Sequence, residues 1–261
     1  MELEVNMENK KSYLVIIIIL ALYVAIVLLL KKNNVFEPKN NYIIFSDEQI
    51  LEINKDKYSF VEKIDNLQNL NFKVYDYTTY LGDYQVNYID GKYRVFGEDN
   101  SAIKFNNDFL AIYSTDDSIK LNTSNTELLN ENDNYIIDKI LKQENINSSI
   151  DNIQGYKRII NIKGEKKYLY NITNTDNNQL FSILFIWNEN DSLLIDKSIV
   201  SKENYINLKS FYVNAIIDID NDGTDEIILN TLSYSQMGGK TKSILRYDKQ
   251  KYKNIEIEKS K

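Results

Sequence analysis

The chain has 261 residues, contains neither cysteine nor histidine, and carries a formal net charge of −7. Without cysteine it can form no disulfide, thiolate zinc site or cysteine nucleophile, and without histidine it lacks the commonest general base and any serine–histidine triad. The negative net charge also argues against a nucleic-acid partner.

An uninterrupted apolar segment lies near the N-terminus. Residues 13–30 contain no charge, proline or glycine. As a helix they would span roughly 27 Å, close to the thickness of about 30 Å of a bilayer's hydrocarbon core. We therefore predict a short tail over 1–11 and a transmembrane helix over 12–30 that anchors the chain in the lipid bilayer. A cleaved signal peptide is the alternative, but small residues suited to a cleavage site are limited to Ala21 and Ala25.

The lysines around this segment do not set its orientation. Two precede it and three follow it by residue 39, so the excess of positive charge that marks the cytoplasmic side does not favour the N-terminal end. A short tail before the span and a large domain after it are the usual layout of an anchor whose N-terminus faces the cytoplasm.

After a polar linker over 31–41, short apolar or alternating runs are separated by Asp, Asn, Gly and Lys. Such runs are typical of successive strands, so we predict a mainly β protein of antiparallel hairpins, arranged as propeller-like blades or as a sandwich. The clearest expected strands are 42–45, 85–89, 92–96, 109–113, 167–172, 181–187 and 211–219.

One stretch, 134–144, places apolar residues at helical spacing. It predicts a short amphipathic helix whose first turn Asp133 caps. The helix and its connector, 133–154, separate an N-terminal β-rich half, 42–132, from a C-terminal β-rich half, 155–261.

A hairpin pattern recurs three times, at 53–58, 88–93 and 247–252. Each copy has an apolar or aromatic residue, four turn residues ending in Lys, and then a Tyr. Alternation on both sides predicts two strands that present one apolar face and join in a tight polar turn. Chance similarity in a Lys-rich and Tyr-rich chain is the alternative.

A longer similarity relates 159–173 to 216–232. Both read as strand, turn and strand, and the alignment matches Gly164 with Gly223, 59 residues apart. A period near 60 residues predicts a repeated unit of roughly four strands, which is the size of a propeller blade.

The turn of the second copy is the one motif in the sequence whose side chains suggest a binding site. Residues 218–226 read DIDNDGTDE, with carboxylates at positions one, three and five, glycine at six and a further carboxylate at nine. This spacing bends a short loop around a hard cation, and oxygen ligands with high negative charge favour calcium. The expected ligands are Asp218, Asp220, Asp222, the carbonyl of Thr224, and Glu226.

The flanks of this loop read as strands, and its twelfth position is Leu229 rather than the glutamate of an EF-hand. The stretch 216–257 instead resembles FG-GAP or VCBS-type repeats of integrin-like propellers and bacterial surface proteins. That resemblance implies a blade-like unit with a structural calcium ion bound by Asp218, Asp220, Asp222 and Glu226. The alternative is a turn that needs no ion, since Asp, Asn and Gly are good turn formers. Mutual repulsion of the carboxylates argues against it.

These features favour a membrane-anchored, extracytoplasmic interaction or scaffold module with a structural calcium ion. A protein or a cell-wall glycan is the expected partner, and no catalytic residue or enzymatic activity is assigned. Weak calcium loops of this kind belong to extracellular modules, which favours a domain facing outward.

Two other hypotheses remain. A carboxylate-based hydrolase of cell-wall glycans would use pairs such as Asp116 and Asp117, with Asp108 nearby. A membrane-tethered sensor would instead face the cytoplasm. An S-x-x-K pattern at 101–104 lacks the companion motifs of penicillin-binding proteins.

Overall fold

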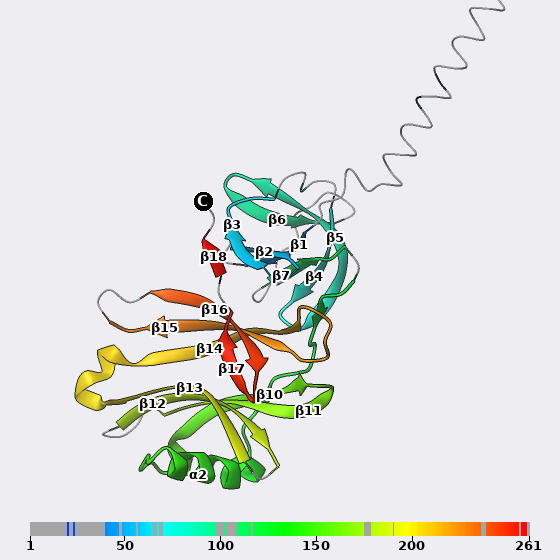
Figure 1. Ribbon diagram of the computed structural model, residues 1–261. Helices are drawn as coiled ribbons and strands as arrows, with labels where there is room; N and C mark the ends of the chain where they lie inside the picture. The colour runs from blue at the N-terminus through cyan, green and yellow to red at the C-terminus, as the bar shows by residue number, and fades with distance from the viewer. Residues whose placement is uncertain are drawn as a thin grey trace, which may run out of the picture. The chain divides into compact units, whose positions relative to one another are not determined.

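A computed structural model shows an antiparallel, mainly β protein with a short α-helix (Figure 1). It describes residues 20, 23, 40–46, 49–55, 57–64, 67, 70–97, 102, 109–115, 117–174, 179–189, 191–235, 239–255 and 257–259. The chain divides into two compact units, Met1–Asn40 and Asn41–Lys261. The predicted transmembrane segment, 12–30, lies outside the described residues except for Leu20 and Tyr23. Across the described residues, no helix has the length and apolar character to cross a membrane.

The largest sheet, sheet I, curls into a half-barrel and has the strand order β18-β3-β2-β1-β7-β4-β5-β6. Its strands are β1 (Asn41–Phe45), β2 (Ile50–Asn54), β3 (Lys57–Val61), β4 (Asn71–Asp76), β5 (Thr79–Ile89), β6 (Lys92–Phe96), β7 (Phe109–Tyr113) and β18 (Ile257–Lys259). The C-terminal strand β18 pairs in parallel with β3, and the other neighbours in this sheet are antiparallel.

Two five-stranded sheets follow, with the orders β13-β12-β11-β10-β9 (sheet II) and β17-β16-β15-β14-β8 (sheet III). Sheet II consists of β9 (Glu127–Leu128), β10 (Ile153–Ile162), β11 (Glu165–Asn174), β12 (Gln179–Asn188) and β13 (Asp191–Ser201). Sheet III consists of β8 (Lys120–Leu121), β14 (Lys209–Asp218), β15 (Glu226–Ser233), β16 (Lys240–Asp248) and β17 (Lys251–Asn254). Each is a four-strand meander extended by a two-residue strand, which matches the repeated unit that the sequence predicts.

The predicted division at 133–154 is crossed in both directions. Strands β8 and β9 precede the helix but pair with β14 and β10, which follow it. Strand β18 ends the chain but pairs with β3 of the first sheet. Contacts therefore link the two predicted halves into one compact unit.

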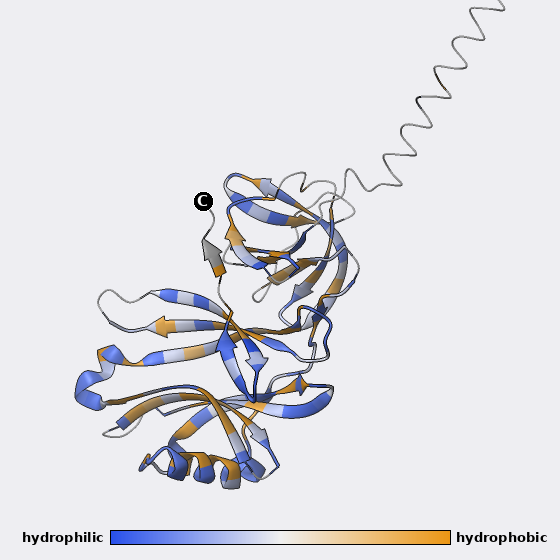
Figure 2. Ribbon diagram, in the orientation of Figure 1, coloured by the Kyte–Doolittle hydropathy of each residue, from blue (hydrophilic) through white to orange (hydrophobic). Residues whose placement is uncertain are grey.

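Helix α2 (Asn134–Gln143) lies against the outer face of sheet II (Figure 2). Its buried apolar residues pack with aromatic residues of β11 and β12. The helix is confirmed, but the predicted cap is not. Asp133 holds the N-cap position and makes no side-chain bond to the helix. Its carboxylate instead accepts hydrogen bonds from Lys157 Nζ at 2.9 Å and Tyr170 Oη at 2.9 Å. The 3-10 turns η2 (Glu131–Asp133), η3 (Ile150–Asn152) and η4 (Lys202–Asn207) lie in connections between these elements.

Sheet III is the middle layer, and both of its faces are buried. Ile216 of β14 packs toward sheet II, whereas the adjacent Ala215 and Ile217 pack toward sheet I. A strand with two apolar faces reads as a continuous apolar run rather than an alternating one. This explains the apolar run 215–217 before the acidic loop, and it places the loop at the end of a buried strand.

The three predicted hairpins are confirmed. The residues that bound each four-residue turn lie directly opposite one another in 53–58, 88–93 and 247–252. In the second hairpin both central residues have positive φ, 52° at Asp90 and 77° at Gly91. Two-residue turns of type I′ require this geometry, which matches the twist of the flanking strands.

Candidate metal centre

The acidic loop connects β14 to β15, beginning after Asp218 and ending at Glu226. Both flanks are strands, as predicted, so the loop closes a β-hairpin rather than joining two helices. Two residues adopt the left-handed conformation, Asn221 with φ of 58° and Gly223 with φ of 80°. Asparagine and glycine tolerate that region best, and the local sequence therefore suits the sharp turn.

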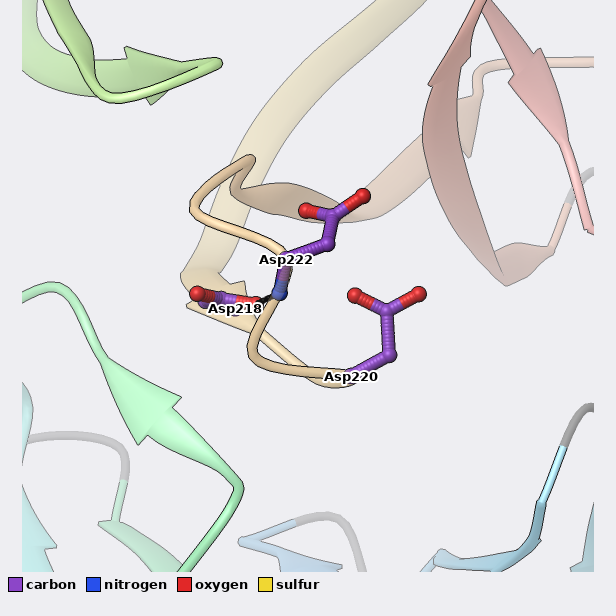
Figure 3. Close-up of side chains that lie close together, drawn as sticks. All are labelled: Asp218, Asp220 and Asp222. Carbon is purple, nitrogen blue, oxygen red and sulfur yellow. Dashed lines mark hydrogen bonds between the residues drawn. The ribbon is translucent and has the colours of Figure 1, made fainter.

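Three of the five predicted ligands come together. One carboxylate oxygen from each of Asp218, Asp220 and Asp222 lies within 4.8 Å of the others. Calcium–oxygen distances are about 2.3–2.6 Å, so oxygens on opposite sides of one ion are separated by about 5 Å. The three carboxylates are thus close enough to share a single ion. Figure 3 shows Asp220 and Asp222 extending from the loop toward the same side.

Asp218 also shapes the loop. It is buried, and its two oxygens accept hydrogen bonds from the backbone N–H of Asp222 at 3.2 Å and of Gly223 at 3.1 Å. Burial raises the pKa of Asp218. Hydrogen bonds from the backbone of Gly223 and Asn221 oppose the increase, and the neighbouring carboxylates of Asp222 and Asp220 add to it. A cation bound by the three carboxylates would offset both the cost of burying their charge and the repulsion among them.

Glu226, the predicted closing ligand, lies outside this group of three. Its carboxylate accepts hydrogen bonds from Arg246 Nε at 2.8 Å and from Ile219 N at 2.9 Å. Burial raises the pKa of Glu226 to about 7, although both of these bonds oppose the increase. Arg246 Nη2 also lies 3.1 Å from Asp220 Oδ2 and bonds to the hydroxyl of Tyr58. Part of the positive charge that the crowded carboxylates require is therefore supplied by β16.

Thr224 contributes to a second contact. Its hydroxyl accepts a hydrogen bond from Lys163 N at 3.2 Å, and Gly164 N donates to Gly223 O at 2.9 Å. These bonds join the acidic turn to the β10–β11 turn, the copy that the sequence alignment matched to it. The two related turns thus lie against each other, one acidic and one without acidic residues.

Asp225 is the residue that sequence reasoning missed. It is 3% exposed, and its Oδ2 accepts hydrogen bonds from Asn161 N at 2.7 Å, Asn161 Nδ2 at 3.0 Å and Asn122 Nδ2 at 2.8 Å. Its carbonyl accepts from Tyr252 Oη at 2.9 Å. Asp225 therefore fastens the loop to its neighbours. In the sequence Asp225 is the acidic residue at the eighth position of the loop, which is not one of the positions expected to hold a ligand.

The carboxylates suggested for a hydrolase gain no support. Asp117 is exposed and pairs with Lys73 Nζ at 2.8 Å. Asp108 and Asp116 lie outside the described residues, as does Ser101 of the S-x-x-K pattern. Within the described part of the chain, the acidic loop is therefore the best-supported of the sites that the sequence suggested.

Comparison of the chain with protein-family models, with curated proteins and with solved structures gave no match in any of the three.

Proposed function

We propose that this chain is a membrane-anchored, extracytoplasmic interaction or scaffold module, stabilised by one structural calcium ion in the β14–β15 loop. The convergence of three aspartate oxygens within 4.8 Å carries the proposal. All candidate ligands are hard oxygen atoms, which suit calcium better than softer metals. Under this proposal the loop is of the FG-GAP or VCBS type.

A structural role fits the position of the loop better than a catalytic one. Asp218 is buried, and the neighbouring turn and Arg246 hold the loop on two sides. An ion shared by Asp218, Asp220 and Asp222 would hold the first half of the loop against the end of β14 in the middle sheet. Because binding to the folded state alone stabilises a protein, its main effect would be on unfolding.

The anchor is an independent part of the proposal and rests on the apolar run at 12–30. The lipid bilayer is then one partner, and a protein or a cell-wall glycan is the other.

Thermal unfolding of a fragment covering 40–261 tests the ion. With calcium at ~10 mM and a dissociation constant of about 0.1–1 mM, the stabilisation is about 1–3 kcal/mol. For a domain of this size it corresponds to an increase in Tm of about 3–10 °C. Calcium should not raise the Tm of Asp220→Ala or Asp222→Ala. It should still raise that of Asp248→Ala, which alters an exposed aspartate in another hairpin of the same sheet. A wild-type Tm that calcium leaves unchanged would show that the metal assignment is wrong.

Orientation is tested separately by adding protease to intact cells that express the full chain. An outward-facing domain is digested, whereas a cytoplasmic sensor domain is protected until the membrane is permeabilised. Protection in intact cells would contradict the extracytoplasmic assignment.

A further inference from the structure

A cleft of about 360 Å³ opens where strand ends of sheets II and III meet. Its floor is formed by Ile162, Ile186 and Leu193, which belong to the hydrophobic core between the two sheets. Tyr247, at the end of β16, contributes a phenol ring to its lining. Small-molecule sites typically have volumes of about 300–1,000 Å³, and the volume of this cleft is within that range, although its lining is more polar than apolar.

Two charged side chains line the cleft, Lys167 and Asp191. Lys167 Nζ lies 3.4 Å from Glu165 Oε2, so its charge is matched by a residue outside the cleft lining. Asp191 Oδ1 accepts a hydrogen bond from the backbone N–H of Ser192 at 2.8 Å. A single paired lysine beside a carboxylate disfavours an anionic ligand such as a phosphate.

Two side-chain amides add to the hydrogen-bonding capacity of Asp191. Asn188 and Gln250 both line the cleft. An amide offers both donors and an acceptor, which matches hydroxyl groups, because each hydroxyl also donates and accepts. Amides above an aliphatic and aromatic surface therefore suit a neutral ligand with polar edges and apolar faces.

We propose that this cleft binds a neutral saccharide unit of one or two rings. The ring faces lie on Tyr247 and the aliphatic floor, and the hydroxyl groups bond to Asn188, Gln250 and Asp191. This inference rests on the interaction module proposed above and gives its partner a chemical class. The chemistry of the cleft itself does not depend on the calcium ion.

Isothermal titration calorimetry of the full chain in detergent tests the proposal. The probes are glucose, galactose, N-acetylglucosamine, maltose and chitobiose, with glycine as a zwitterionic comparison. At least one sugar should bind, and Asn188→Ala and Gln250→Asn should each weaken that binding roughly tenfold, as expected for one lost hydrogen bond. Absence of sugar binding, or binding of glycine alone, would overturn the proposal.

A matched pair of variants separates the cleft from its surroundings. Lys167→Gln and Glu165→Gln break the same ion pair, but only Lys167 lines the cleft. Because no sugar hydrogen bond is assigned to this ion pair, both variants should leave sugar affinity within about twofold, unlike Asn188→Ala and Gln250→Asn. A loss from Glu165→Gln as large as that from Asn188→Ala would refute the assignment. Each titration is repeated with calcium and with EDTA. Sugar binding in a protein whose Tm does not respond to calcium would show that only the metal assignment is wrong. A calcium effect on Tm without sugar binding would show that only the cleft assignment is wrong.

Discussion

Replacement of Asp225 by alanine tests whether this residue fastens the acidic loop to its neighbours. The substitution removes three hydrogen bonds on one carboxylate oxygen and leaves Asn161 N–H without that partner. Hydrogen bonds to a charged group contribute about 1.5–3 kcal/mol each. Burial raises the pKa of Asp225, which means that burying the ionised carboxylate costs free energy. Removing the carboxylate recovers this cost and offsets part of the loss of the hydrogen bonds. The net loss is about 2–4 kcal/mol of unfolding free energy.

Urea unfolding in EDTA measures the loss, with far-UV circular dichroism and the fluorescence of Trp187 as signals. A loss of this size lowers the Tm by about 5–15 °C in a domain of this length. Asp220→Ala is the control in the same loop, because its contact with Arg246 joins partly exposed groups and contributes at most about 1 kcal/mol. If Asp225→Ala costs less than Asp220→Ala, the reasoning about the buried carboxylate is wrong.

Two further predictions concern buried charges. Burial raises the pKa of Glu226 from 4.5 to about 7. The folded protein then keeps a proton that the unfolded chain releases, so in metal-free buffer the unfolding free energy should fall as pH rises between these values. Glu226→Gln should flatten that slope, and an unchanged slope would contradict the assignment. For Asp133, burial opposes ionisation, but hydrogen bonds from Lys157, from the backbone and from Tyr170 outweigh it and lower the pKa. Its contribution to stability is therefore present above pH 3.8 and lost as pH falls through the lowered value. Asp133→Asn leaves Lys157 buried without its main counter-charge and should cost about 3 kcal/mol in urea unfolding at neutral pH. A cost below about 1 kcal/mol would show that the pair is not a stabilising one.

The sequence predicts features that have local causes. The hairpins at 53–58, 88–93 and 247–252 follow from alternation and turn residues within a few positions of one another. The helix at 134–144 follows from apolar spacing on one face. The acidic loop lies between strands, as expected, because its composition and its apolar flanks are both local signals.

The contacts that complete the candidate site are not local. Arg246 is 20 residues from Glu226 and 188 from Tyr58, and Asp225 is 103 residues from Asn122. Pairing over such distances depends on how sheets stack, which periodicity does not reveal. Strands of two or three residues, such as β8, β9 and β18, are also too short to show an alternating pattern. The strand pairings that cross 133–154 could not be predicted from the sequence for the same reason.

The pairing of β18 determines how the domain responds to tension. In sheet I the order β18-β3-β2-β1 places the first and last strands of the domain in one sheet. Strand β1 is antiparallel to β2, β2 is antiparallel to β3, and β18 is parallel to β3. Strands β1 and β18 therefore run in the same direction, and a pull between Asn41 and Lys259 acts along the strands in opposite senses. Such a load shears the short β18–β3 pairing, of three residue pairs, along the strands rather than opening it from one end. Sheets II and III are not part of the order β18-β3-β2-β1 that carries the load.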